Sequence, residues 1–592
     1  MKKIIFLFSL FCSLIVFSQN EQLAQNYFDK GEFEKALISY QELIVAQPFN
    51  GFYFQRIVDC YQQLKQYEAS EKFILERYNK FKQAPLLVEL GYNYQLQKDE
   101  NKAKKYYEQA LDKIKKNPTE VYGVAAVFER KVLIDYALQA YQMAIELDPK
   151  LNFNFQMALL YGQKGETDKM IEKFLEESYT NPQNLFAIQN QFSRFMTENA
   201  DVNFNNALRK DLLLRTQQSQ DVFWNQYLSW YFVQQKEIGK AFIQEKAIYK
   251  RNPESLSNIV NLAQLAIEED EKETANEILT FVLENTQDRE LQIQAHYFLI
   301  EMKINKAQNN EFIAIETELN SLLKQFGISP YSLKLQILKA HFDTFQMKNP
   351  EQGKSILKTA LELPLDEYQK ADVKMELADI FLFQEKFNQA LLYYSQIEED
   401  LKNDVIGHEA SLKAAKTSYF KADFVWALKQ FKELKSVPSQ LIANDAMEYF
   451  LLINDNTVAD STQTALKQFA RGDYLLYQNK SQEALSLFQD ILKNFKGQEI
   501  ESVTLLRLGK TYENLGDYTS ALSQYQTIID KHQDGIYVDE SLYFSAEIYN
   551  KQLKDFEKAK PLYEQLVFHH EDSIYFVEAR RKFRELRGDL VP

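Results

Sequence analysis

The segment LGYNYQLQKDENKAKKYYEQA, residues 90–110, decides the fold of this chain. Two sets of three residues recur in it at helical spacing: Leu90, Gly91 and Tyr94, then Ala103, Tyr107 and Ala110. Gly91 and Ala103 lack bulk where two antiparallel helices cross, so the helices can approach closely. Tyr94 and Tyr107 fill the space on either side. The segment therefore predicts a packed helical hairpin.

The second half of this pattern, a small residue followed four positions later by an aromatic one, returns along the chain. It occurs at Ala36/Tyr40, Ala103/Tyr107, Ala137/Tyr141, Ala390/Tyr394, Ala427/Phe431, Ala484/Phe488, Ala521/Tyr525 and Ala559/Tyr563. In four units a proline lies twelve residues after the small position, at Pro48, Pro149, Pro182 and Pro253. Proline ends a helix because its φ is fixed and it has no N–H to donate. The prolines therefore predict that the second helix of these units ends at a constant distance from its small residue, as a repeat requires.

The spacing of the small positions identifies the repeat. Positions 36, 70, 103, 137 and 170 are separated by 34, 33, 34 and 33 residues. These residues resemble the tetratricopeptide-repeat family, whose unit is about 34 residues. The resemblance implies an all-α, right-handed superhelical solenoid of antiparallel helix pairs. Its concave face would be lined mainly by the first helix of each pair.

The repeat spacing also divides the chain. The step from Ala427 to Ala484 is 57 residues, which is one longer unit plus about one helix. We therefore expect an extra helix near Gln440 to Ile453 and a polar linker after it. The expected divisions are an N-terminal array (20–289), irregular helical repeats (290–365), further repeats (366–435), a break with the extra helix (436–465), and a C-terminal array with a capping helix (466–592).

The first nineteen residues have the composition of a signal peptide. Lys2 and Lys3 precede an apolar stretch from Ile4 to Phe17, and Val16-Phe17-Ser18 is a plausible cleavage site. The apolar stretch, residues 4–17, is shorter than the roughly 20 residues that span a bilayer. We expect residues 1–19 to be removed on export. The mature chain would then have no transmembrane segment and would lie in the periplasm or peripheral to the outer membrane.

Composition and motifs argue against several classes of function. The formal net charge of −15 disfavours sequence-independent nucleic-acid binding, which needs a cationic surface, and it favours basic or neutral protein partners. The sequence contains no HExxH, no GxSxG, no Gly-rich phosphate loop and no closely spaced pair of cysteines. We expect no enzyme activity, no cofactor and no metal.

The last repeats are similar to those of bacterial envelope proteins, namely the repeat-containing lipoprotein of outer-membrane assembly and periplasmic coordinators of cell division. The resemblance implies a non-catalytic protein–protein interaction scaffold of the bacterial cell envelope. Its partners would be proteins or peptides, including outer-membrane or cell-wall assembly factors. The side chains expected to point into the concave groove are Arg56, Asp59, Glu89, Tyr92, Asn152, Gln156, Arg507, Lys510 and Asn514.

An alternative is an accessory or regulatory subunit of an envelope enzyme or secretion complex. A further alternative is an enzyme whose active site lies in the irregular region, residues 290–365. That region contains His296, His341, Glu301 and Asp343, but they form no ordered motif.

Overall fold

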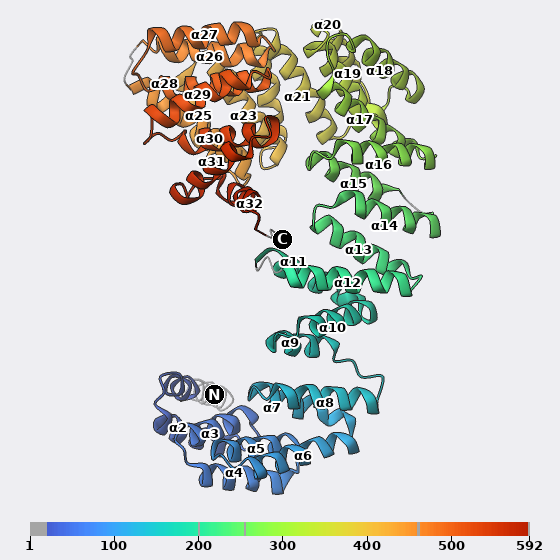
Figure 1. The fold of residues 1–592 in the computed structure, drawn as a ribbon, viewed down its shortest axis with the longest axis vertical. Coiled ribbons are helices and arrows are strands. Elements are labelled where there is room, and N and C mark those ends of the chain that lie inside the picture. The colour runs from blue at the N-terminus through green and yellow to red at the C-terminus, as the bar shows by residue number, and fades with distance from the viewer. Residues whose placement is uncertain (1–19, 199–201, 254–255, 459–461, 590–592) are drawn as a thin grey trace, which may run out of the picture. The chain divides into compact units, whose positions relative to one another are not determined.

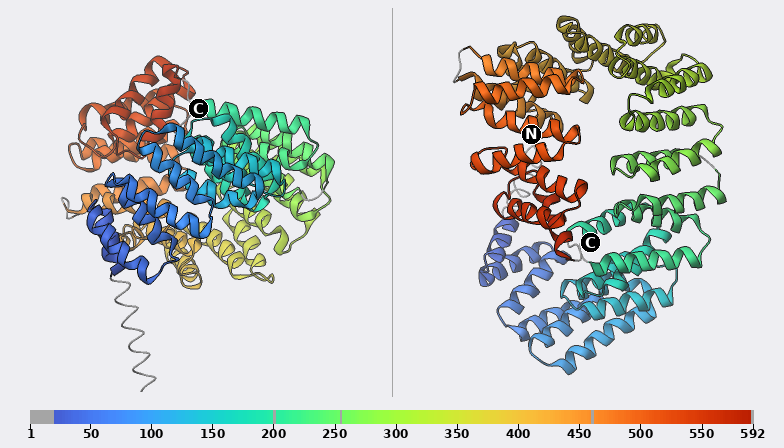
Figure 2. Two further views of the ribbon diagram at one scale, coloured as in Figure 1. Left: turned by 90° about the horizontal axis from the view of Figure 1, so that it is seen from below. Right: turned by 45° about the horizontal axis from the view of Figure 1, so that its top comes forward.

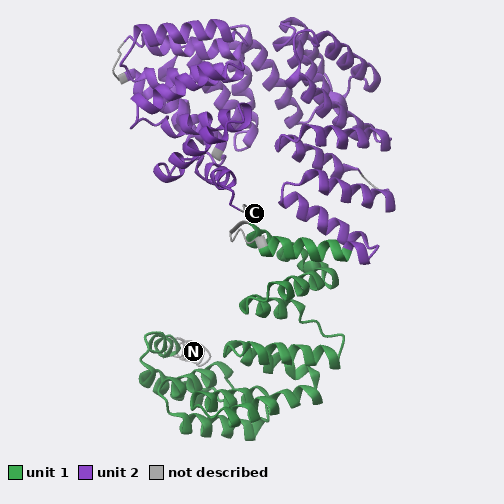
Figure 3. Ribbon diagram, in the orientation of Figure 1, with its two compact units in different colours: residues 1–215 green, residues 216–592 purple. Residues whose placement is uncertain are grey.

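The computed structural model describes residues 20–198, 202–253, 256–458 and 462–589, and all their regular structure is helical (Figure 1). The chain forms two compact units, residues 1–215 and 216–592 (Figure 3). The expected signal peptide, residues 1–19, lies outside the described residues. Within the described ranges no helix is both long enough and apolar enough to cross a membrane.

The first unit consists of consecutive antiparallel helix pairs, beginning with helical residues 20–29. Its further helices are α2 (Phe33–Ala46), α3 (Gly51–Gln63), α4 (Tyr67–Phe81), α5 (Pro85–Leu96), α6 (Glu100–Lys116), α7 (Val121–Arg130), α8 (Ile134–Leu147), α9 (Asn154–Gln163), α10 (Thr167–Thr180), α11 (Leu185–Glu198) and α12 (Val202–Gln218), in which the unit boundary falls.

The second unit continues the same arrangement, which two further views also show (Figure 2). Its helices are α13 (Val222–Gln234), α14 (Ile238–Arg251), α15 (Ser257–Glu268), α16 (Lys272–Asn285), α17 (Arg289–Lys306), α18 (Phe312–Phe326), α19 (Leu333–Phe345), α20 (Pro350–Ala360), α21 (Glu367–Phe383), α22 (Phe387–Asp400), α23 (Val405–Phe420), α24 (Phe424–Leu434), α25 (Gln440–Val458), α26 (Thr464–Tyr477), α27 (Ser481–Asn494), α28 (Ile500–Asn514), α29 (Tyr518–Lys531), α30 (Val538–Glu547), α31 (Phe556–His569) and α32 (Phe576–Arg587). The predicted all-α solenoid of helix pairs is confirmed.

The α5/α6 and α28/α29 hairpins each contain a close contact between a glycine and an aromatic ring. A Cβ added at Gly91 would lie 2.3 Å from Cε1 of Tyr107, and one added at Gly509 would lie 2.3 Å from Cε1 of Tyr525. Both tyrosines are buried, and their hydroxyls donate hydrogen bonds to the end of the preceding helix. The Tyr107 hydroxyl bonds to Gln95 at 2.7 Å. The ring therefore packs against one helix while its polar end remains hydrogen-bonded.

The pairing order changes between α24 and α26. Helix α25 occupies residues 440–458, and the segment expected as a polar linker is helical as far as Val458. Helix α26 then contacts the end of α21, more than ninety residues earlier. The Tyr474 hydroxyl donates to the Leu382 carbonyl at 2.6 Å, and the Tyr477 hydroxyl donates to the Asp379 carbonyl at 2.9 Å. These bonds bring first helices of non-consecutive pairs together.

Gly509→Ala tests the hairpin contact. The added methyl group has no space against Tyr525, so we expect a loss of about 1–3 kcal/mol in unfolding free energy. Urea unfolding followed by circular dichroism measures this loss. The matched control is Gly239→Ala in α14, where the nearest heavy atom to an added Cβ is 3.9 Å away. A loss of stability as large in the control as in Gly509→Ala would contradict the packing explanation.

Candidate protein-binding grooves

The second unit contains a cavity of about 490 Å³ where non-consecutive first helices meet. Side chains from α19, α21, α22, α23, α25, α26 and α28 line it. Its lining combines aromatic rings with charged groups, among them Asp379, Lys413, Lys416, Asp473 and Arg507. Since no single helix pair supplies this set, the cavity is a product of the stacking.

One ion pair joins α21 to α23 at the cavity wall. The Lys413 ammonium lies 2.7 Å from Oδ2 of Asp379, and the Tyr394 hydroxyl donates to Oδ1 of the same carboxylate at 2.5 Å. Burial acts to lower the pKa of Lys413, but the charge and hydrogen bond of Asp379 outweigh it, so that pKa is raised above its usual value. Lys413 is therefore a cation at neutral pH.

A second ion pair joins α26 to α28. Nε of Arg507 lies 2.9 Å from Oδ1 of Asp473, whose Oδ2 accepts a hydrogen bond of 3.0 Å from the Tyr419 hydroxyl. Glu448 lies 3.5 Å from the guanidinium on another side. Burial acts to lower the pKa of Arg507, but the combined charge interactions with Asp473, Tyr449, Glu448 and Tyr419 outweigh it, so that pKa is raised. The buried charges thus occur as compensated groups, as the cost of desolvation requires.

A third group of contacts lies where α19 lines the cavity. Nδ1 of His341 is 3.0 Å from Oε1 of Glu376, and its ring stacks on Phe345 with centroids 4.4 Å apart. Burial lowers the pKa of His341, while the hydrogen bond and charge of Glu376 raise it, and the net change is upward. His341 therefore carries more positive charge near neutrality than a free histidine.

Three of the groove residues predicted in the first unit come together around one lysine. Lys131 Nζ lies 2.9 Å from Asp59 Oδ1, 3.3 Å from Glu89 Oε2 and 4.7 Å from the centre of the Tyr92 ring. Arg130 pairs with the other Glu89 oxygen at 2.6 Å. Glu89 is buried in these ion pairs. The sequence analysis missed Arg130 and Lys131, which end α7, where a positive charge interacts well with the helix dipole.

The other predicted residues of the first unit lie apart from this cluster. The Arg56 guanidinium lies 4.2 Å from the centre of the Phe28 ring, at the edge of a cavity of about 820 Å³. Asn152 precedes α9 and donates to Glu177 at 2.6 Å. Gln156 lines a separate cavity of about 360 Å³ with Asn152.

The three residues predicted on α28 have different surroundings. Arg507 lines the cavity of the second unit, and Lys510 pairs with Glu540 at 2.6 Å. Asn514, the last residue of the helix, is exposed. The sequence placed these residues on one stripe of the helix, but it contained no signal for the carboxylates that would meet them.

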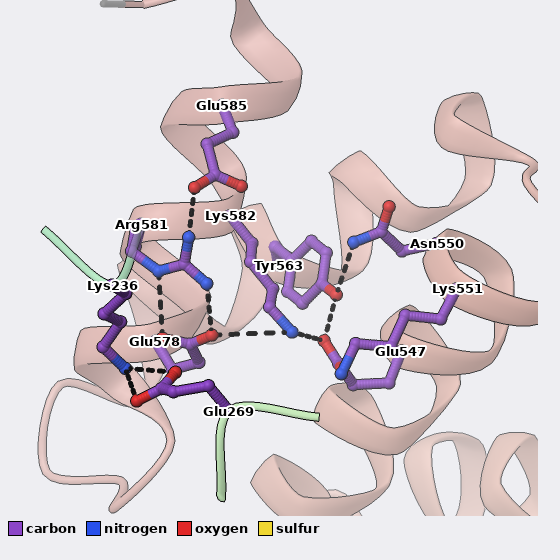
Figure 4. Close-up of polar contacts among 10 residues, drawn as sticks. All are labelled: Lys236, Glu269, Glu547, Asn550, Lys551, Tyr563, Glu578, Arg581, Lys582 and Glu585. Atoms are coloured by element: carbon purple, nitrogen blue, oxygen red, sulfur yellow. Dashed lines mark hydrogen bonds and ion pairs between the residues drawn. The ribbon is translucent and has the colours of Figure 1, made fainter. Parts of the chain in front are cut away.

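The C-terminal end of the array carries its own charged network (Figure 4). Lys582 of α32 and the Tyr563 hydroxyl both donate to Glu547, and Lys551 lies 2.9 Å from the same carboxylate. Burial raises the pKa of Glu547, but these donors outweigh it and lower that pKa. The network ties α32 to the preceding helices, so its role is structural.

The candidate catalytic residues of the irregular region do not form one site. His341 contacts Glu376, whereas Asp343 is buried and hydrogen-bonded to Lys339. Glu301 accepts a hydrogen bond of 2.9 Å from Tyr297 of its own helix. In the part of the chain that the structure describes, no three His, Cys, Asp or Glu side chains are grouped so that they could hold a metal ion.

Cys60 is the one cysteine in the described part of the first unit, and it is buried. Cys60 of α3 is fully enclosed, and burial raises the pKa of its thiol to about 12. Because the thiolate is the reactive form, this side chain behaves as a small apolar core residue.

Three segments match profiles of the tetratricopeptide repeat: residues 84–112, 504–535 and 539–567. They coincide with the pairs α5/α6, α28/α29 and α30/α31. These three pairs are therefore tetratricopeptide repeats, and the stacked helix pairs of both units have the architecture of a tetratricopeptide-repeat solenoid. No curated protein shows significant similarity to the chain.

Several solved structures are similar at low identity. The Naa15/Naa10 complex bound to HypK-THB has 12% identity and a TM-score of 0.27, covering 97% of this chain and 96% of that one. Yeast Tom70 has 13% identity and a TM-score of 0.31, covering 85% of this chain and 99% of that one. The P58(IPK) TPR domain has 14% identity and a TM-score of 0.19, covering 62% and 98%.

Asp473→Ala tests the compensated pair at the cavity. The substitution leaves the Arg507 guanidinium without its closest carboxylate, so we expect a loss of about 3 kcal/mol in unfolding free energy. The matched control is Asp445→Ala, which removes a more exposed partner from Lys416 and should cost less than about 1 kcal/mol. Chemical unfolding of both variants gives the comparison. Equal losses would show that Asp473 is no more important than a surface charge.

Proposed function

We propose that this protein is a non-catalytic scaffold that binds peptide or protein partners in grooves lined by the first helices of its repeats. The cavity of the second unit carries the proposal, because side chains from α19, α21, α23, α26 and α28 converge there. A surface assembled from successive repeats suits an extended partner, which contacts several repeats at once.

We propose further that the protein acts in the bacterial cell envelope, in the periplasm or peripheral to the outer membrane. Two features of the sequence support this location: the signal-like segment at residues 1–19 and the similarity of the last repeats to envelope proteins. Outer-membrane or cell-wall assembly factors are then the partners to seek.

Site-specific photocrosslinking tests the scaffold function. A photoreactive residue at position 341, in the cavity wall, should capture a discrete partner in cells, which mass spectrometry then identifies. The matched control is position 425. Val425 is highly exposed and lies on α24, the second helix of its pair. Enrichment of one envelope assembly complex from position 341 alone supports the proposal. No specific product, or the same products from both positions, would contradict it.

Processing of the chain tests the location. We expect the protein isolated from its own cells to begin near Gln19 and to fractionate with the periplasm, because the apolar stretch directs export. Leu10→Arg interrupts that stretch and should leave the full-length chain in the cytoplasm. N-terminal sequencing and fractionation measure both results, and an unprocessed wild-type chain in the cytoplasm would exclude export.

A further inference from the structure

We propose that one edge of the first unit binds the surface of a membrane that contains anionic phospholipids. The contact consists of the turn between α2 and α3 together with the end of α4. Its residues are Val45, Phe49, Lys80, Phe81 and Lys82, which we call the edge patch. The inference rests on the proposed position peripheral to a membrane, and it specifies the surface that makes that contact.

Two large apolar side chains of the edge patch point into solvent. Val45 is 79% exposed and Phe49 is 75% exposed. The Phe49 ring meets the Phe81 ring edge to face, with centroids 5.9 Å apart. The neighbouring cavity of about 820 Å³ includes Phe52 in its wall but none of the edge patch. Such an apolar tip suits insertion into the boundary between lipid headgroups and acyl chains.

The turn that presents Phe49 is fixed by hydrogen bonds. The Arg77 guanidinium donates to the Pro48 carbonyl at 3.3 Å and to the Phe49 carbonyl at 3.4 Å. The Asn50 side chain then caps α3 by accepting from the amides of its first turn. The exposure of Phe49 is therefore a property of the folded turn, and little conformational freedom is lost when the ring inserts.

Unpaired cations lie beside the apolar tip. The Lys80 ammonium is 6.0 Å from the centre of the Phe49 ring and 5.2 Å from that of Phe81. Lys82 is also exposed. Neither lysine, nor Arg77, forms an ion pair with any residue that the structure describes. An ammonium group beside an inserted ring can reach the phosphate oxygens of the headgroups.

The next repeat extends the positive charge along the same edge. Second helices of stacked repeats run parallel, so α4 and α6 end on one edge. Residues 77–83 and 113–119, at these two ends, each carry three cations and no carboxylate.

The excess of cations persists when one further helical turn is included. Residues 42–54, 76–88 and 112–122 together carry six cations against four carboxylates, whereas the whole chain has 69 against 84. This edge is therefore locally positive in an acidic chain, which complements an anionic lipid surface.

These features favour a lipid surface over an acidic protein. A stable protein interface involves roughly 20–30 residues on each side, with its anchors in well-packed pockets. The edge patch instead consists of a few side chains at two helix ends. Lipid contact needs only such a small inserted group with cations beside it.

Vesicle flotation tests the inference. The mature chain is used, so that the apolar stretch at residues 4–17 cannot itself bind lipid. We expect the chain to float with vesicles that contain phosphatidylglycerol and to remain unbound with pure phosphatidylcholine. Raising the ionic strength should release most of the bound chain, because salt screens the attraction.

Phe49→Ser should weaken binding about tenfold, because it removes the inserted ring. The matched control is Phe186→Ser on α11. Phe186 is also 75% exposed, but residues 180–193 around it carry no charged side chain. The control should bind like the unmodified chain.

Lys80→Gln combined with Lys82→Gln should weaken binding to the anionic vesicles about tenfold or more. The matched control combines Lys104→Gln with Lys105→Gln. These two lysines are exposed near the beginning of α6, which lies on the opposite edge from its end. Circular dichroism checks that all variants are folded.

No flotation with anionic vesicles, flotation that does not depend on phosphatidylglycerol, or equal losses in a variant and its control would overturn the inference. Capture of an acidic protein by a photoreactive residue at position 49, without vesicle binding, would overturn it in favour of a protein interface. If position 341 still captures a partner, such results reject only the membrane contact. Vesicle binding without any capture at position 341 would reject the scaffold function instead.

Discussion

The structure depends on the close approach of two helices at a small residue covered by an aromatic ring. Gly91 against Tyr107 and Gly509 against Tyr525 have no space for even one methyl group. This contact sets the distance between the helices of a pair, and each pair then offers an apolar face to the next. A repeat that cannot bury this face alone must stack, so the contact within a pair also leads to the solenoid.

The groove of the second unit arises where regular stacking is interrupted. Helix α25 adds an element between two pairs, and α26 returns to hydrogen-bond with the end of α21. Side chains of both α21 and α26 line the cavity. The tyrosines that make the return, Tyr474 and Tyr477, belong to the first helix of a repeat, where the pattern requires only helical spacing.

The charges in this cavity occur as ion pairs on neighbouring helices. Asp379 and Asp473 are less exposed than Lys413 and Arg507, whereas Asp445 and Glu448 are more exposed than their partners Lys416 and Arg507. Burying such groups is costly unless each has a partner, and the tyrosine hydroxyls of Tyr394 and Tyr419 supply further hydrogen bonds. Tyr394 and Tyr419 therefore pack in the core and also hold the carboxylates of Asp379 and Asp473 in place.

The sequence by itself determined the helix pairs and their period, because small and aromatic residues at helical spacing act locally. It also placed Arg507 on the inner stripe of its helix. Only the tertiary structure decided which charges meet. Asp473 lies 34 residues before Arg507 and Asp379 lies 34 before Lys413, yet nothing in either helix marks the partner. Lys131 likewise forms ion pairs with Asp59 and Glu89, which lie on other helices. Local periodicity defines which face a residue occupies, whereas the partner across that face depends on how the pairs stack.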